Sequence, residues 1–414
     1  MSVSVKYAIY LSIAALMCTA HAQAWAQKHD SWSLQAGVST FFDDNLFRRD
    51  TGLEVDDQIT STFVGLNLDK AWSRQRVVVN ANLSNNRYRD NDQLDYPGKD
   101  LDAAWHWGVT ARLKGKLSAR YQETINSFED FSRTSKNIRT TQNYQFDMEW
   151  GVVGHWSVLA GVGKYDRENS EIFLAESDYG SDSVELGVKY TTLADNYLAL
   201  VFRKAKGHYD NREINAALGI DSGFDDQRLE ARFLWLLSGR SRFFGNLGYE
   251  ERVHENVGAR DFQGVVGDLN YRWQFNDNLR FDVGFEQDLI SYQSSPISDT
   301  YLILNGSAFY NSSFYRLRRF ELAPVWQLSD RMGLSARYRH DNRLFQGGFI
   351  DEIPGFGALE DRDDDIDSLL IQLVWAPYDP LQVAFTLQED KRNSNRTRAD
   401  YVSRMASARL TLVF

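Results

Sequence analysis

The stretch Val325-Trp-Gln-Leu-Ser-Asp-Arg-Met-Gly-Leu-Ser-Ala-Arg-Tyr338 decides the fold of this chain. Apolar and polar side chains alternate on both sides of a short polar segment at residues 329–331. Successive side chains of a β-strand point to opposite faces, so this pattern predicts a tight hairpin with one apolar and one polar face.

The same hairpin pattern recurs along the whole chain. Seven further short turns are predicted at residues 70–75, 114–115, 152–154, 192–196, 238–241, 276–278 and 376–380. The eight hairpins supply sixteen strands, and residues 31–41 and 401–414 add one strand at each end, which gives about 18 strands. An even number of strands with alternating short turns and long polar loops is typical of bacterial outer-membrane barrels, whose short turns are periplasmic.

One segment does not fit this regular scheme. Residues 301–328 are too long for a single membrane-crossing strand, and Pro324 stands where an internal strand should lack proline. We expect residues 301–310 to form an extracellular extension or an extra ribbon, so the sequence gives the strand count only to within two.

The first 26 residues have the features of a secretory signal peptide. Lys6 precedes an apolar run at residues 7–19, and small residues follow it in the patterns Ala20-His-Ala22 and Ala24-Trp-Ala26. Such a run is too short to span a bilayer as a helix, so residues 1–26 are expected to be removed. Cys18 is the only cysteine, and its loss would leave residues 27–414 without a disulfide or a thiolate metal site.

Composition favours one continuous sheet over several soluble domains. Aromatic residues make up 14% of the chain, prolines number six, and the remainder shows no linker and no apolar stretch long enough for a helical membrane span. A closed antiparallel transmembrane β-barrel covering residues 27–414 is the predicted fold, because closure removes the exposed edges of a long sheet. The net charge of −11 argues against nucleic acid as a partner.

Tryptophan positions and the last strand both support a Gram-negative outer membrane as the location. Seven tryptophans lie within a few residues of predicted short turns, as an interfacial aromatic girdle requires: Trp72, Trp150, Trp156, Trp235, Trp273, Trp326 and Trp375. The final strand places Leu410, Leu412 and the terminal Phe414 on one face. This terminus resembles the signal that the barrel-assembly machinery reads, and lipid and lipopolysaccharide are the expected surroundings.

The strand faces opposite to lipid would line a lumen. Side-chain parity points these predicted lumen residues inward: Arg112, Arg120, Glu230, Arg232, Arg272, Arg280, Asp282, Arg337 and Arg409. Charges of both signs can pair across a barrel as structural struts. They can equally line a hydrated path in which guanidinium and carboxylate groups exchange hydrogen bonds with a passing polar chain. The sequence leaves both interpretations open.

Chemistry is not indicated by any motif. The histidines are scattered, and neither a metal-ligand spacing nor a nucleophilic serine motif occurs, so we predict no enzyme, no cofactor and no metal. The acidic run at residues 361–367 lacks the glycine and the terminal glutamate of a calcium loop and is expected to be a solvated loop face.

One loop differs from the others in its apolar content. Residues 344–359 contain Phe345, Phe349, Pro354 and Phe356 among several glycines. So much apolar surface is unfavourable in water, which predicts that this loop folds over the mouth as a constriction.

The first strand and loop, Ser33-Leu-Gln-Ala-Gly-Val-Ser-Thr-Phe-Phe-Asp-Asp-Asn-Leu-Phe-Arg48, together with units such as Trp326-Gln-Leu-Ser-Asp-Arg331, resemble a known family. These are the EpsL-like outer-membrane proteins of exopolysaccharide operons, in the putative β-barrel porin group. The resemblance extends over most of the chain after the signal peptide, and its distinctive part is residues 43–48. It implies export of an exopolysaccharide together with periplasmic export components, and it supplies no catalytic residues.

Three functions therefore remain open from the sequence. The main prediction is a channel that exports an exopolysaccharide, the first alternative is a general or solute-selective porin, and the second is a structural or adhesion barrel. Sugar export would need aromatic side chains that stack on sugar rings. Five tyrosines could serve in this way or in a second lipid girdle: Tyr88, Tyr165, Tyr209, Tyr292 and Tyr338.

Overall fold

A computed structural model of the chain provides the fold. It describes residues 31–129, 134–171, 177–212, 214, 221–256, 258, 261–291, 314–346, 352–353, 357–358, 361–396 and 399–414. The predicted signal peptide and the predicted extension at residues 301–310 lie outside these residues.

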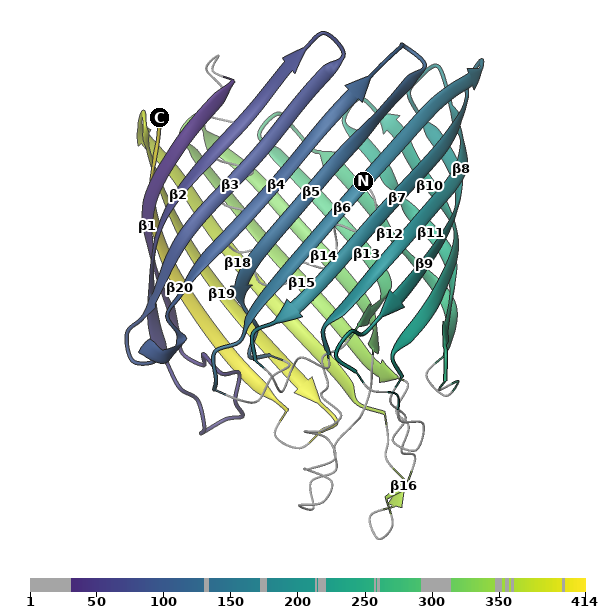
Figure 1. Ribbon diagram of the computed structural model, residues 1–414. Coiled ribbons are helices and arrows are strands. Elements are labelled where there is room, and N and C mark those ends of the chain that lie inside the picture. The colour runs from purple at the N-terminus through teal and green to yellow at the C-terminus, as the bar shows by residue number, and fades with distance from the viewer. Residues whose placement is uncertain are drawn as a thin grey trace.

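The described residues form 18 long strands in one antiparallel sheet (Figure 1). The strands are β1 (Trp32–Asp43), β2 (Asp57–Trp72), β3 (Gln75–Tyr88), β4 (Tyr96–Gly108), β5 (Leu113–Ile125), β6 (Ile138–Val153), β7 (Trp156–Asn169), β8 (Tyr179–Thr191), β9 (Tyr197–His208), β10 (Gly223–Ser238), β11 (Ser241–His254), β12 (Phe262–Gln274), β13 (Leu279–Ser291), β14 (Phe314–Ser329), β15 (Met332–Gln346), β18 (Asp363–Tyr378), β19 (Leu381–Ser394) and β20 (Tyr401–Val413). The long connections contain a ribbon of two short strands, β16 (Glu352–Ile353) and β17 (Gly357–Ala358), each of two residues. They also contain a short 3-10 helix, η2 (Asp92–Leu94).

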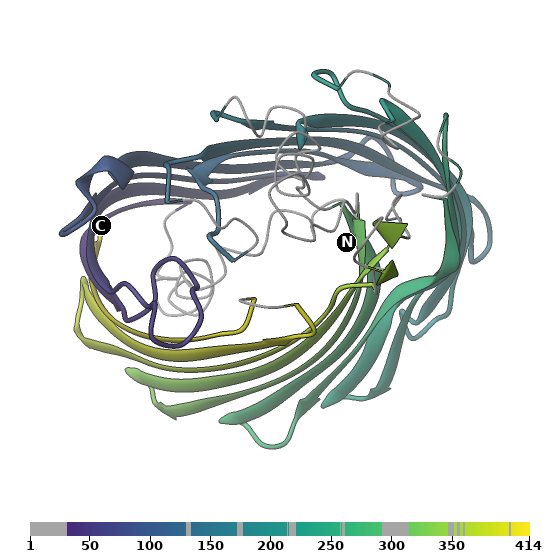
Figure 2. The ribbon, with the colours of Figure 1, turned by 90° about the horizontal axis from the view of Figure 1, so that it is seen from below.

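The sheet closes on itself because β1 pairs with both β2 and β20. Each strand pairs with its neighbours in sequence, which leaves no free edge to the sheet. Viewed along its axis, the ring of strands is oval (Figure 2). The predicted all-β barrel and its strand count of 18 are confirmed.

Short turns lie at one end of the barrel and long connections at the other (Figure 1). Seven of the eight short turns occur where the sequence predicts them, but the turn between β4 and β5 occupies residues 109–112 instead of 114–115. Gly115 lies inside β5, and the ring of Trp107 occupies its side-chain space, since a Cβ there would clash with the indole. Gly115 is therefore a strand glycine covered by an aromatic ring and not a turn glycine, and the predicted turn position at residues 114–115 was wrong.

Pro324 lies within β14, the strand whose length was in doubt. It pairs with Phe281 of β13, while the ladder to β15 is interrupted at Ala323 and Pro324. Because proline has no N–H to donate, a gap in one ladder accommodates it without ending the strand.

The outer wall of the barrel is apolar and exposed. Leu83, Leu186 and Leu387 are more than half exposed and belong to strands spread around the ring. A continuous band of this kind is stable only against lipid, so the molecule is an outer-membrane barrel. Among the described residues, no helix is long and apolar enough to cross a membrane.

The seven predicted girdle tryptophans all stand on this outer wall, close to the short turns. Each of them is between 40% and 53% exposed. At the end of the chain, Leu410 and Leu412 face outward on β20, and the backbone of Phe414 exchanges two hydrogen bonds with Leu34. Their predicted roles in membrane anchoring and assembly stay predictions.

Candidate functional site

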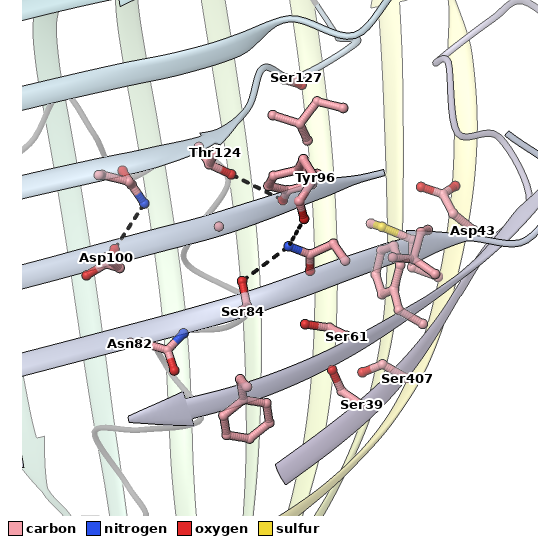
Figure 3. A pocket seen from close by; sticks show the side chains of 18 of the residues that line it. Ser39, Asp43, Ser61, Asn82, Ser84, Tyr96, Asp100, Thr124, Ser127 and Ser407 are labelled. Atoms are coloured by element: carbon pink, nitrogen blue, oxygen red, sulfur yellow. Dashed lines mark hydrogen bonds between the residues drawn. The ribbon is translucent and has the colours of Figure 1, made fainter. Parts of the chain in front are cut away.

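A cavity of about 670 Å³ lies inside the barrel against β1–β5 and β18–β20, and β15 supplies part of its rim. Uncharged amide and hydroxyl side chains form the most numerous polar group of the lining (Figure 3). They are Gln35, Ser39, Ser61, Asn67, Asn80, Asn82, Ser84, Asn86, Gln122, Thr124, Asn126, Ser127, Thr386, Gln388 and Ser407. Such groups both donate and accept hydrogen bonds and carry no charge.

Strand parity produces this lining directly. On β3, Asn80, Asn82, Ser84 and Asn86 occupy alternate positions and point inward, while Leu83 between them faces lipid and is 57% exposed. Neighbouring side chains of the lining interact loosely. The amide of Asn86 donates to Ser84 Oγ at 3.2 Å (Figure 3). The wall therefore offers many polar groups that are able to exchange partners.

Three of the predicted lumen arginines stand beside this cavity. Arg120 lies 3.7 Å from the carboxylate of Asp100, and Arg337 is buried on the β15 side. The guanidinium of Arg409 covers the ring of Phe63 at 3.9 Å, a cation–π contact that the sequence did not indicate. The amide and hydroxyl side chains of the lining are called the neutral wall below, and these three arginines stand beside them.

Five other predicted lumen residues face the interior on a different part of the wall. Arg232 on β10 contacts both Glu230 and Glu185, and its distance to Glu185 is 2.8 Å. Arg272 and Arg280 both pair with Asp282, and the Arg280 contact is 3.0 Å. The structure does not bring these groups to the cavity.

Arg112 was placed wrongly. It stands exposed in the short turn at residues 109–112 and not on an inward strand face. The turn begins earlier than predicted, so the parity count failed at this hairpin.

A dense ion-pair cluster on β10, β11 and β13 was missed by the sequence analysis. Arg228 is 2% exposed and contacts Glu250 at 2.6 Å and Asp288 at 3.1 Å. Arg252 binds Asp226 next to it at 2.7 Å. The alternation of Arg228, Glu230 and Arg232 was the available signal. This part of the wall matches the strut interpretation.

A short segment after β5, residues 126–129, crosses the mouth and is called the strap below. Its Glu129 carboxylate forms an ion pair with Arg343 Nη2 on β15 and accepts a hydrogen bond from the Tyr401 hydroxyl on β20, both at 3.1 Å. Arg392 Nη1 on β19 donates to the Glu129 carbonyl at 2.6 Å. Around the closed sheet, β15 is eight strands from β5, so the strap reaches almost to the opposite wall.

The strap carries the charge of a partly buried carboxylate, that of Glu129. Burial raises the pKa of Glu129, but the positive charges of Arg343, Arg392 and Arg339 outweigh this effect and hold the pKa far below its ordinary value of 4.5. Glu129 therefore stays ionised and attached at any ordinary pH.

Apolar side chains fasten the strap from the near side. Phe128 meets Phe47 edge to face with ring centroids 4.9 Å apart, and both belong to a buried cluster with Leu46, Tyr88 and Leu94. All four strap residues border the cavity. The strap and this cluster thus cover part of the long-loop end of the neutral wall.

The segment at residues 43–48, on which the family resemblance depends, builds the adjacent part of this mouth. The Asp43 carboxylate accepts hydrogen bonds from Ser403 Oγ at 2.9 Å and from the Asn45 backbone amide at 3.0 Å, and it pairs with Arg48 at 2.7 Å. These contacts direct the chain after β1 toward the interior of the ring of strands (Figure 2). Leu46 and Phe47 are thereby directed toward the strap.

Only part of the predicted constriction at residues 344–359 belongs to the described residues, so the constriction stays a prediction. Phe345 belongs to β15 and is fully buried against Tyr315 and Leu317. Phe349, Pro354 and Phe356 lie outside the described residues. In the part that is described, the strap occupies the mouth, although its sequence looks like an ordinary polar loop.

The tyrosines predicted to meet sugars are also separated. Tyr165 and Tyr209 belong to an inward aromatic group with Tyr179 and Phe224, and the guanidinium of Arg212 covers Tyr209 at 3.7 Å. Tyr88 lies in the mouth cluster. Tyr338 faces outward and donates to Asp367 at 2.7 Å. Tyr292 lies outside the described residues.

Comparisons with known proteins concern the fold alone. No model of a protein family matches the chain, and no curated protein matches it. Among solved structures, OpdK from Pseudomonas aeruginosa shares 11% identity at a TM-score of 0.46, with 92% of this chain and 99% of OpdK covered. OccK2 (OpdF) from the same organism, in complex with glucuronate, shares 10% identity at 0.48, with coverage of 93% and 98%. OprD, also from Pseudomonas aeruginosa, shares 11% identity at 0.45, with coverage of 92% and 95%. The 18-stranded barrel is established by the strand pairings of this chain itself, and these Pseudomonas proteins are solved structures to which it is similar.

Proposed function

We propose that this protein is an outer-membrane channel that passes hydroxyl-rich solutes, in particular saccharides, along the neutral wall of its lumen. The observation that supports this most is the set of amide and hydroxyl side chains that β1, β2, β3, β5, β19 and β20 contribute to the cavity lining, interspersed with charged and apolar residues. A barrel of this strand number has room for an aqueous passage.

The chemistry of the wall suits a sugar. A sugar hydroxyl donates and accepts at once, as Asn, Gln and Ser side chains do, so each step along the wall replaces one weak hydrogen bond by another. Weak and repeated sites allow a solute to enter and also to leave. The charged lining residues are balanced, because Arg48, Lys99, Arg120, Arg337, Arg339 and Arg409 stand against Asp43, Asp100, Asp102, Glu123, Glu129 and Asp390. Neutral solutes therefore meet no strong net field.

Liposome swelling with neutral sugars tests this proposal. Vesicles that contain the protein should swell in galactose severalfold faster than empty vesicles. Asn82→Leu, on the inward face of β3, should slow swelling severalfold while sodium chloride conductance changes little. Asn85→Leu is the matched control, because Asn85 lies on the outward face of the same strand and is exposed. Swelling no faster than in empty vesicles would overturn the proposal.

Export of a polysaccharide is the second candidate. The residues of the family resemblance border the same cavity through Asp43, Leu46 and Arg48, which joins that motif to the neutral wall. The lining runs along β1 from Gln35 to Asp43, about 25 Å of strand, so several sugar units of one chain would contact it together.

Deletion of the gene tests export independently of transport in vesicles. Loss of surface polysaccharide with accumulation in the periplasm is expected if the barrel exports it. Normal surface polysaccharide in the deletion strain would reject the export role. If the vesicles are permeable to sugars in the same study, the solute-channel proposal stands.

A further inference from the structure

We propose that Arg343, Arg392 and Tyr401 form a carboxylate-binding cradle, that Glu129 of the strap occupies it in the resting channel, and that the carboxylate of an acidic saccharide takes its place. This inference deepens the proposed function and rests on it. It assigns acidic saccharides as the ligand class of the site at the mouth of the lumen. In the absence of such a ligand, Glu129 of the strap fills the same site.

The cradle is built before Glu129 enters it, because its members come from the rigid wall. Arg343 belongs to β15, Arg392 to β19 and Tyr401 to β20, and their exposures are 2%, 5% and 3%. Each arginine also stacks on an aromatic ring, Arg343 on Tyr315 at 5.4 Å and Arg392 on Tyr401 at 4.7 Å. The donors are thus held in place by strands and rings and not by the strap.

The fit is specific for a carboxylate. One oxygen of Glu129 pairs with the guanidinium of Arg343 and accepts from the hydroxyl of Tyr401, each at 3.1 Å. Charge-assisted hydrogen bonds of this type are stronger than neutral ones, and a neutral hydroxyl in the same place would leave Arg343 with only the more distant Asp341 carboxylate, at 3.8 Å. A sugar with an acidic group therefore replaces Glu129 better than a neutral sugar does.

The position of the cradle connects it to transport. Glu129 and Tyr401 both border the cavity, so a solute on the neutral wall meets this site directly. Withdrawal of Glu129 removes one negative charge from a balanced lining, and a uronic acid restores that charge. The same sugar can bind the neutral wall through its hydroxyl groups. Acidic saccharides are thus the ligand class that can bind the cradle through a carboxylate and the neutral wall through hydroxyl groups.

Competition with a tethered group sets the expected range of concentration. A ligand held by a short connection behaves as if it were present at millimolar concentration, so a free ligand must reach a similar level to displace it. Phe128 and the Arg392 contact to the Glu129 carbonyl add to the attachment of the strap. We therefore expect a response in the millimolar range or above.

Single-channel recording in planar bilayers tests the cradle with galacturonate and its neutral counterpart galactose. At constant ionic strength, sodium galacturonate should increase the open fraction of the wild type severalfold, while galactose should not. Glu129→Gln, which keeps the size of the side chain, should show a high open fraction without ligand and no further response. Glu171→Gln, in the connection between β7 and β8, is the control and should behave as the wild type does.

Two outcomes would overturn the cradle. Equal effects of galactose and galacturonate would show that the site does not select acidic saccharides. A Glu129→Gln channel with the open fraction of the wild type would show that Glu129 does not compete with a ligand. Arg343→Gln should abolish the galacturonate response, but if it fails to assemble, Glu129→Gln alone still decides. Galactose swelling of wild-type vesicles is measured beside these recordings, so that a failed cradle is distinguished from a failed channel.

Discussion

Glu129 and Arg343 form a 3.1 Å ion pair across the mouth of the barrel, between a connection after β5 and a strand eight positions away around the sheet. Pairs between adjacent strands only reinforce a wall that is already hydrogen-bonded. This pair instead ties a loop to the far wall, so its making and breaking changes the opening of the lumen.

The acid stability of this pair follows from the pKa of Glu129. Arginine charges lower the pKa below 4.5 despite burial, so the pair is complete above 4.5 and is lost only as the pH falls through the lowered folded value. We expect the open fraction of single channels to stay constant between pH 7 and pH 4.5 and to increase only at lower pH. A rise centred at or above pH 4.5 would contradict this. Glu129→Gln should show no such rise.

The near side of the strap depends on the contact between Phe128 and Phe47. Replacement of a packed phenylalanine by alanine costs about 3–5 kcal/mol in a core, and here the loss falls on a local attachment. Phe128→Ala should therefore increase the current fluctuations and the mean conductance of single channels, while the thermal stability of the barrel changes little. Leu53→Ala, an exposed position in the connection between β1 and β2, is the control and should leave the recordings unchanged.

The barrel was predictable from the sequence because the residue patterns that specify its strands and short turns are local. Alternation and short turns repeat every hairpin, and a lipid-facing wall makes each repeat visible as apolar residues. The one misplaced turn shows the limit of this reasoning. Gly115 looks like a turn residue, but it lies inside β5 directly opposite Trp107 of β4, whose ring covers it, and the residue pattern alone does not reveal that cross-strand contact.

The site was less predictable because its decisive contacts are distant in sequence. Glu129 meets Arg343 and Tyr401, which are separated from it by more than half of the chain. No periodicity marks such a pairing, and the strap has no apolar run to distinguish it. Inward parity, by contrast, placed Arg120, Arg337 and Arg409 beside the cavity, since parity is fixed by the strand itself.

The ion-pair cluster around Arg228 predicts a large stability effect away from the cavity. Arg228→Met would leave Glu250 and Asp288 as buried carboxylates without this partner, which costs about 3–5 kcal/mol. The unfolding midpoint in urea, measured in detergent micelles by tryptophan fluorescence, should fall accordingly.

The exposed pair of Arg76 and Asp69 offers the comparison for this prediction. Their side chains are 54% and 47% exposed, so Arg76→Met should change stability by less than about 1 kcal/mol. Similar midpoints for the two variants would mean that the buried cluster does not brace the wall.

The membrane orientation predicts a difference between two lipid-facing positions on adjacent strands. Leu186 lies in the middle of β8 and is 64% exposed, whereas Trp156 begins β7 beside a short turn and is 52% exposed. An arginine at the bilayer midplane costs about 2–4 kcal/mol, but near the interface it costs about 0–1 kcal/mol because the side chain reaches water. Leu186→Arg should therefore strongly reduce the folded fraction in lipid vesicles, measured as the heat-modifiable band on a gel, while Trp156→Arg should fold nearly as the wild type does. If the two variants folded equally well, residues beside the short turns would not lie at a membrane interface, and the assignment of the tryptophans to a girdle would be wrong.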